Sequence, residues 1–275
     1  MTGYSFLSEH HVALAFNGPK PTLVILDLRL APNFLDFNIT DLADIDCLCA
    51  FKFPKLRPYE HIVWASVQVD QNPIPISSTR VDSNQLYPTP EDNVVIFSFH
   101  WTVNPTSGRI IAVLPLKSLR PYLETLETTK HHVDVEWEEW GPQHSRMFVI
   151  PSDALYALAD SSRSVFGTRF ATVCRTLRIY DFNPRKVERA ERNDSKIGTR
   201  WILDDRRVTI LRDATPFEDS VTTSLSYLYA DIPLPSHLEG DWETALNDNG
   251  VTIYKKFNDG HLSFLQKWAA FSLSV

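Results

Sequence analysis

The sequence predicts an all-β fold of the propeller type, built from small antiparallel units. Long helical periodicity is scarce, whereas short β-type runs recur between polar or proline-containing segments. Two runs, "TLVILDL" from Thr22 and "TLRIYDF" from Thr176, share the pattern T-L-x-I-x-D-apolar, and each follows another apolar run after a short polar gap. Hairpins that recur at irregular intervals are typical of propeller blades with variable loops. The alternatives are a β-sandwich with insertions and a mixed fold.

The expected strands follow one another along the whole chain and are mostly apolar or alternating. They are Tyr4–Ser8, Val12–Phe16, Thr22–Leu28, Cys47–Phe53, Ile62–Val69, Val94–Thr102, Arg109–Leu114, Met147–Ile150, Arg169–Val173, Thr176–Phe182, Arg207–Leu211, Ser224–Ile232 and Val251–Phe257. Short helices are expected at Leu116–Leu126 and at Ala154–Ser161, where Ser152 or Asp153 would form the N-cap.

The chain reads as one domain over residues 1–275, with about three to four blades by this strand pattern. Two polar segments interrupt it, near residues 70–92 and near residues 188–198. Neither segment coincides with a change in composition, so both are expected to be loop insertions and not linkers between domains.

Composition and charge argue against several classes of function. The net charge of −7 and the lack of a basic block argue against a nucleic-acid groove. No apolar run is long enough to span a membrane, and the N-terminus does not resemble a secretory signal. With three cysteines and no signal, an intracellular location is expected, cytoplasmic or nuclear. Neither phosphate-binding glycine motif occurs, so no nucleotide cofactor is expected.

The most unusual stretch is "VEWEEWGPQHSR", Val135 to Arg146. On an extended strand Glu136 and Glu138 would share one face, and a carbohydrate-active enzyme using Glu136 and Glu138 is therefore an alternative function. The favoured interpretation is structural. Trp137 and Trp140 would anchor an ordered loop in apolar surface, Gly141-Pro142 would turn the chain, and Arg146 would offset the acids.

Other reactive side chains have simple structural interpretations. Cys47 and Cys49 lack a second ligand pair at zinc-site spacing. His10-His11 and His131-His132 are adjacent pairs that would point in opposite directions on a strand. Ser98 and His100 share a strand face but lack an orienting acid. No catalytic, cofactor-binding or metal-binding residue is therefore predicted, and the chain is expected not to be an enzyme.

Several motifs together resemble a large group of fungal F-box proteins, in the propeller-like region that follows their F-box. "EWEEWGPQHSR" is similar to that group's "PWEEWGP-x-x-[ST]-R" signature, and "TLRIYDFNPRKVER" to its "L-x-[IVL]-x-D-F-N-P" segment. "YSFLSEHHVALA", "EDNVVIFSFHW", "GRIIAVLPLKSL", "FGTRFATV", "DDRRVTIL" and "SVTTSLSYLYADIPL" follow the same order of generic strands. The resemblance covers nearly the whole chain, and the first two motifs are its most specific parts.

The resemblance implies a non-enzymatic protein-interaction domain, the substrate-recognition region of a Skp–cullin–F-box ubiquitin ligase. The target protein is unknown, and the protein-binding residues implied are Trp137, Glu138, Trp140 and Arg146. The F-box itself is absent from the chain, so a Skp-type adaptor is a partner only if an F-box exists upstream. A shortened gene is the expected origin, and a degenerate fragment without function is a further alternative. In "DFNP", Asp181 and Asn183 are expected to hydrogen-bond the turn that Pro184 begins.

Overall fold

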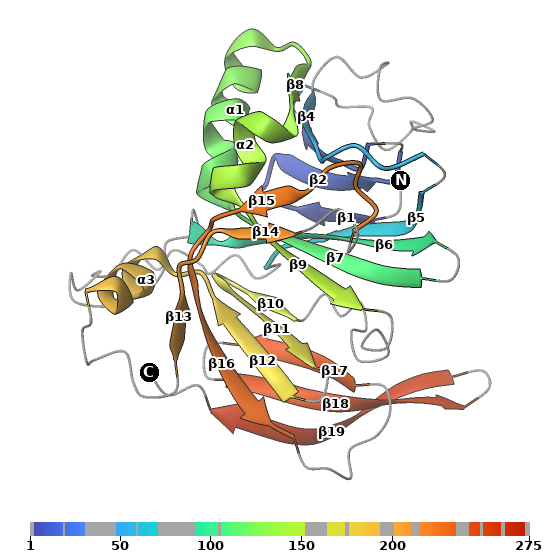
Figure 1. Ribbon diagram of the computed structural model, residues 1–275, viewed down its shortest axis with the longest axis vertical. Helices are drawn as coiled ribbons and strands as arrows, with labels where there is room; N and C mark the ends of the chain where they lie inside the picture. The colour runs from blue at the N-terminus through green and yellow to red at the C-terminus, as the bar shows by residue number, and fades with distance from the viewer. Residues whose placement is uncertain are drawn as a thin grey trace. The chain divides into compact units, whose positions relative to one another are not determined.

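The structure is a computed structural model that describes residues 3–18, 20–30, 48–58, 60–70, 92–103, 106–151, 164–173, 176–192, 201–210, 215–234, 242–247, 250–259 and 262–272. Strands dominate these residues, which confirms the prediction of a mostly β fold (Figure 1). The chain forms two compact units, each discontinuous in sequence: residues 1–71, 95–151 and 207–225 make the first, and the remaining residues make the second. The single-domain organisation stays a prediction.

The first unit contains a five-stranded sheet, a four-stranded sheet and a hairpin. The five-stranded sheet has the order β1 (Gly3–Phe6), β2 (His11–Phe16), β3 (Thr22–Asp27), β4 (Leu48–Lys52) and β8 (Val133–Val135). The four-stranded sheet has the order β5 (His61–Gln68), β6 (Val94–Val103), β7 (Thr106–Pro115) and β9 (Arg146–Pro151), and β14 (Val208–Ile210) pairs with β15 (Val221–Thr223). β4 and β8 are parallel, which corrects the expectation of purely antiparallel units.

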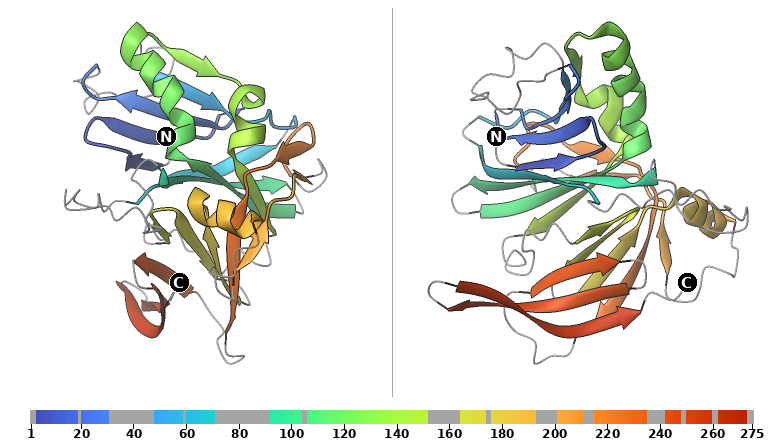
Figure 2. Two further views of the ribbon diagram at one scale, coloured as in Figure 1. Left: turned by 90° about the vertical axis from the view of Figure 1, so that its left-hand side faces the viewer. Right: turned by 180° about the vertical axis from the view of Figure 1, so that it is seen from behind.

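Apolar side chains of both sheets and of two helices form the core of the first unit. Helix α1 (Leu116–Thr129) contacts β4, β7 and β8, and helix α2 (Trp137–His144) contacts β4 and β15 (Figures 1 and 2). Buried rings of Phe53, Phe97 and Phe99 lie at the centre, and Phe53 stacks on Phe97 with 4.5 Å between ring centroids. The helix expected at Leu116–Leu126 is confirmed as α1.

The second unit has two sheets and one helix. Its five-stranded sheet has the order β10 (Val165–Phe166), β11 (Arg169–Val173), β12 (Thr176–Asp181), β16 (Tyr227–Pro233) and β13 (Ile202–Asp204). Its three-stranded sheet has the order β17 (Trp242–Asn247), β18 (Gly250–Asp259) and β19 (Leu262–Ser272), and helix α3 covers Pro184–Glu191. Apolar residues of β11, β12, β17 and β18 form one core cluster.

The internal repeat of the sequence corresponds to two hairpins with the same register. In β2–β3, Asp27 at the end of the second strand lies opposite His11, and in β11–β12, Asp181 lies opposite Arg169. Both aspartates are buried, and each accepts a hydrogen bond from the backbone N–H two residues later, at 2.9 Å and 3.0 Å. The repeat therefore includes a strand-terminal carboxylate that stabilises the turn after it.

Two further expectations need correction, and others lie outside the described residues. The segment near 188–198 was expected to be an insertion, but residues 188–191 belong to α3 because Asn183 caps the helix and Pro184 starts it. Three expected segments lie outside the described residues. They are residues 71–91 of the first insertion, residues 193–198 of the second insertion, and the helix at Ala154–Ser161.

Candidate functional site

The stretch that begins at Glu136 is a helix, not the extended strand or loop that its sequence suggests. Helix α2 starts at Trp137, and Glu136 is its N-cap. The Glu136 side chain accepts from the N–H of Glu139, while the Glu139 carboxylate accepts from the N–H of Glu136 at 3.2 Å. This reciprocal capping box satisfies two backbone donors at the start of the helix. Glu136 and Glu138 therefore do not share one face of a strand.

The two tryptophans of α2 belong to the core of the first unit. Trp137 is 6% exposed and Trp140 is 1% exposed. Their rings meet edge to face at 4.9 Å, and both rings contact Phe53. The Trp140 indole also donates to the Lys52 carbonyl at 3.2 Å. The predicted anchoring role of both rings is confirmed, and neither ring is placed to act as an exposed binding hot spot.

Gly141 makes this packing sterically feasible. A Cβ atom at Gly141 would lie 2.2 Å from the Trp137 ring, which is closer than any van der Waals contact. Gly141 is thus required for close packing and does not form the turn that was expected, because the helix continues through Pro142 to His144. Arg146 follows in β9 and is 2% exposed, so it does not present its guanidinium to a target protein.

The acidic residues of this stretch have different environments. Glu138 is exposed. Glu136 accepts hydrogen bonds from Lys52 and Lys20, each at 3.1 Å, and these two ammonium groups lower the pKa of the Glu136 carboxyl. A glycosidase needs one carboxyl group whose pKa is raised so that it can donate a proton. Glu136 does not meet that requirement.

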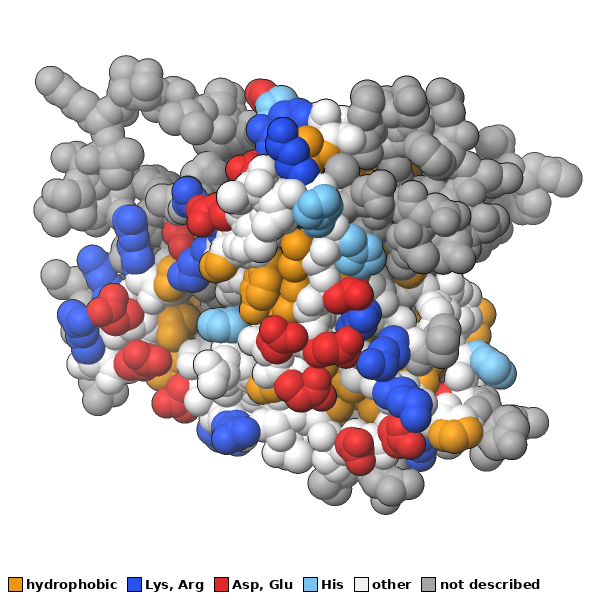
Figure 3. Space-filling model, turned by 90° about the horizontal axis from the view of Figure 1, so that it is seen from above, with side chains coloured by type: hydrophobic (Ala, Val, Ile, Leu, Met, Phe, Trp, Pro, Cys, Tyr) orange, Lys and Arg blue, Asp and Glu red, His pale blue; other side chains and the backbone are white. Residues whose placement is uncertain are grey.

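A pocket of about 240 Å³ opens beside the start of α2, within the first unit. Buried residues Phe53, Trp137 and Val221 contribute to its floor, together with Pro54. Its rim is charged and polar, and consists of Lys20, Lys55, Glu136, Glu138, Glu218, Asp219 and Ser220. Acidic and basic side chains also lie next to one another elsewhere on the surface, as the face seen in Figure 3 shows. The pocket is the candidate functional site because it combines a packed floor with a polar rim.

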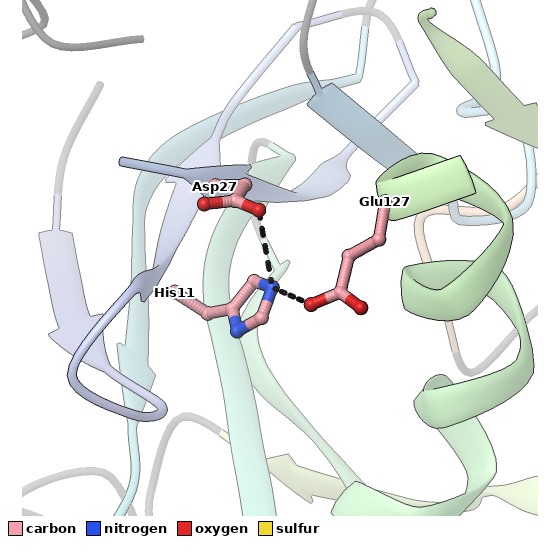
Figure 4. A group of neighbouring side chains, drawn as sticks. All are labelled: His11, Asp27 and Glu127. Atoms are coloured by element: carbon pink, nitrogen blue, oxygen red, sulfur yellow. Dashed lines mark ion pairs between the residues drawn. The ribbon is translucent and has the colours of Figure 1, made fainter. Parts of the chain in front are cut away.

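A second charged cluster lies at the repeated hairpin of β2 and β3 (Figure 4). His11 Nε2 lies 4.0 Å from Asp27 Oδ2 and 3.8 Å from Glu127 Oε1, and burial lowers the pKa of His11. Arg29 Nη2 donates to the same two oxygens, at 2.6 Å each. The guanidinium therefore already supplies the positive charge that a metal ion would bring, and the cluster ties the turn after β3 to α1.

The sequence analysis did not identify His11 as a member of this charged cluster. The internal repeat contained one signal of its role. The residue opposite the strand-terminal aspartate is His11 in one hairpin and Arg169 in the other, and each interacts with that aspartate. His132 pairs instead with Asp134 at 3.0 Å.

The remaining sequence candidates have structural roles. The Ser98 hydroxyl bonds Ser66 at 3.0 Å and Arg109 at 2.9 Å and not His100, so no Ser–His dyad forms. Burial, with Arg109 nearby, lowers the pKa of His100 to about 4.

The thiols also carry no catalytic arrangement in the described residues. Cys49 is fully buried, and burial raises the pKa of its thiol to about 12. Cys47 and Cys174 lie outside the described residues. The pair Cys47 and Cys49 therefore has only one described member, and that member is inaccessible.

In "DFNP", Asp181 and Asn183 build the start of α3. Asn183 is the N-cap, and its side chain accepts from the N–H of Arg185 at 3.0 Å and of Lys186 at 3.4 Å. Asp181 accepts from the N–H of Asn183. The expectation that these side chains hydrogen-bond the segment after them is confirmed, although that segment is a helix and not only a turn.

Comparisons of the chain with protein-family models, with curated proteins and with solved structures found no match. None of the helices in the described ranges combines the length and the apolar character that a membrane-spanning helix requires.

Proposed function

We propose that the chain is a non-enzymatic protein-interaction domain and that the pocket beside α2 is its recognition site. The observation that carries the proposal is the composition of this pocket, in which a rigid aromatic floor supports a rim of exposed charges. Interfaces of this kind gain affinity from a packed centre and gain specificity from charges at the rim. Glu138 is the residue of the predicted set that remains available to a partner, because Trp137, Trp140 and Arg146 are buried.

The arrangement of α2 favours recognition over catalysis. Its apolar side chains fix the helix in the core through ring contacts on Phe51 and Phe53. The capping box fixes the first turn, and two lysines hold Glu136. Because the first turn of α2 and the pocket floor are already fixed, these parts lose little conformational entropy when a partner binds.

Two repeated hairpins support the resemblance to a propeller-derived recognition region. Each ends its second strand with a buried aspartate whose carboxylate accepts from the next turn, and Asp204 does the same for the N–H of Arg206 at 3.2 Å. A local unit repeated at this level of detail is expected when blades of one type recur along a chain. Under this proposal the chain corresponds to the target-recognition part of an F-box ubiquitin-ligase receptor, and adaptor binding would require an F-box.

The test uses the whole chain and two matched charge reversals. Glu138→Lys changes the pocket rim, whereas Glu188→Lys makes the same change on an exposed residue of α3 in the second unit. Proteins captured from extracts by the immobilised chain are then purified and titrated against both variants. We expect a partner whose affinity falls at least about tenfold for Glu138→Lys and stays unchanged for Glu188→Lys. If every captured protein binds both variants equally, the pocket is not a recognition site.

A further inference from the structure

We propose that the pocket beside α2 binds one arginine or lysine side chain of a partner protein, with arginine preferred. This inference rests on the proposed function and adds the chemistry of the partner. The first observation behind it is that the rim of the pocket carries more carboxylates than ammonium groups. Of the residues that line the pocket, two carry ammonium groups, Lys20 and Lys55, and four carry carboxylates, Glu136, Glu138, Glu218 and Asp219. Lys52, which does not line the pocket, also pairs with Glu136 at 3.1 Å.

Both lysines of the rim already have carboxylate partners. Lys20 pairs with Glu136 at 3.1 Å, and Lys55 pairs with Glu218 at 2.8 Å. Among the described residues, neither Glu138 nor Asp219 takes part in an ion pair or a side-chain hydrogen bond. Two carboxylates therefore line the same small pocket without an ion pair of their own, because Lys55 attracts Asp219 only over a longer distance. A ligand that brings a positive charge would pair with these two carboxylates.

The size of the pocket favours a single side chain. Its volume of about 240 Å³ is below the range of roughly 300–1,000 Å³ that sites for whole small molecules occupy. A long basic side chain fits such a space because its methylene groups can lie on apolar surface while its charged end reaches the polar rim. Here the apolar surface comes from Phe53, Pro54, Trp137 and Val221.

Arginine matches this rim better than lysine does. The guanidinium group presents several N–H donors in one plane and can bind two carboxylate oxygens at once, whereas an ammonium group acts as a point charge. Glu138 comes from the first turn of α2, and Asp219 comes from the segment before β15, so the two acids approach the pocket from different elements. An acidic partner side chain would meet net negative charge and is disfavoured.

The test uses the full chain and small probes that stand in for one partner side chain. The probes are Nα-acetyl-arginine methylamide, the corresponding lysine compound and, as a neutral control, the glutamine compound. Binding is followed by NMR through the indole N–H signals. Trp137 lines the pocket, whereas Trp140 does not line it and donates to the Lys52 carbonyl, so Trp140 reports on the integrity of the fold.

The decisive variant is Glu138→Gln with Asp219→Asn, which removes both carboxylates that lack a cation partner. The matched control is Glu124→Gln with Glu188→Gln, which removes the same charge from exposed residues outside the pocket. We expect the arginine probe to shift the Trp137 signal saturably with millimolar affinity, and the pocket variant to weaken binding at least about tenfold. The control variant should bind like the unmodified chain.

Several outcomes overturn the proposal. Equal binding to both double variants would show that general charge attraction is responsible, and equal shifts with the glutamine probe would show that no cation is selected. A protein partner that needs Glu138 but contributes no basic side chain would leave the proposed function intact and remove this inference. Saturable arginine binding in a chain for which no protein partner depends on Glu138 would support the cation pocket and remove the protein-recognition function.

Discussion

Replacing Asp181 by asparagine should destabilise the second unit by about 3–5 kcal/mol, because it leaves a buried ammonium group without its counter-ion. The Asp181 carboxylate is 1% exposed and accepts four hydrogen bonds. Two are neutral, from Thr168 at 2.8 Å and from the N–H of Asn183 at 3.0 Å. Two come from charged groups, Arg169 and Lys186, each at 3.1 Å.

The magnitude follows from the donors that asparagine cannot satisfy. Its oxygen can keep the two neutral bonds, but its amide N–H₂ would face both cations. Each lost bond to a charged group is worth about 1.5–3 kcal/mol. Arg169 is 15% exposed and recovers part of that loss from water, whereas Lys186 is 7% exposed and recovers little.

Amide hydrogen exchange in β12 and α3 measures the local free energy of unfolding that this prediction concerns. Lys186→Met in the Asp181→Asn background should restore part of the stability, since it removes the uncompensated charge and keeps the apolar stem. Asp27→Asn, the equivalent change in the other repeat, should cost only about 1–2 kcal/mol, because its partner Arg29 is 47% exposed. A loss below about 1 kcal/mol for Asp181→Asn, or no rescue by Lys186→Met, would refute the argument.

The same ion cluster predicts a dependence on pH. Burial alone would raise the pKa of Asp181, but Lys186 and Arg169 outweigh it and lower the pKa below 3.8. The stabilisation is therefore complete above the pKa of the unfolded chain and is lost as pH falls through the native pKa. Exchange in the unmodified second unit should accelerate below about pH 4, and Asp181→Asn should remove this acid-dependent component.

Three other predictions concern the first unit. Gly141→Ala should cost about 1–3 kcal/mol in denaturant unfolding, since its Cβ would overlap the Trp137 ring, whereas Gly18→Ala, where the nearest atom is 3.6 Å away, should be nearly neutral. Cys49 should resist thiol reagents at pH 8 until the chain unfolds, because burial raises its pKa to about 12; rapid labelling of this cysteine in the native chain would contradict its burial. The pKa of His100 is lowered to about 4 in the folded chain, so His100 binds its proton more readily when the chain is unfolded. The free energy of unfolding should therefore fall on acidification between pH 6.5 and 4, by up to about 1.4 kcal/mol per pH unit. The variant His100→Gln should flatten this slope, and an unchanged slope would refute the assignment.

The positions of many strands, though not their order in the sheets, could be predicted because these strands have an apolar or alternating local pattern. The repeat T-L-x-I-x-D marks β3 and β12, and both pair with the strand before them as expected. Helix α1 was also expected, over Leu116–Leu126, and it starts at Leu116. The secondary structure of these elements is determined by short stretches of sequence.

Helices α2 and α3 were missed for two different reasons. The alternation in Glu136-Trp137-Glu138 imitates a strand, and the capping box that fixes the helix uses glutamate at the N-cap, where serine, threonine, aspartate or asparagine is the usual residue. For α3 the signal was present, because Asn183 followed by Pro184 is a common helix start. The aspartate before it suggested a turn only.

The candidate pocket could not be predicted from sequence, because its walls come from distant segments. Phe53 follows β4, Trp137 starts α2, and Val221 starts β15, and only the fold of the first unit brings these residues together. No local pattern records that juxtaposition. The signature stretch pointed to the right region, but it did not separate the residues that support the pocket from those that face a partner.

That separation decides which substitutions can test function. Along α2, Trp137, Trp140 and Gly141 are buried, whereas Glu138 and Glu139 are exposed. Trp140→Ala would therefore remove a ring that is 1% exposed and cost about 3–5 kcal/mol, so any loss of binding would report unfolding. Glu138→Gln changes an exposed side chain of nearly the same shape and leaves the core untouched. A binding defect caused by Glu138→Gln in a chain with unchanged thermal stability would therefore assign recognition to the outer face of α2, and an unchanged affinity for a confirmed partner would place recognition elsewhere.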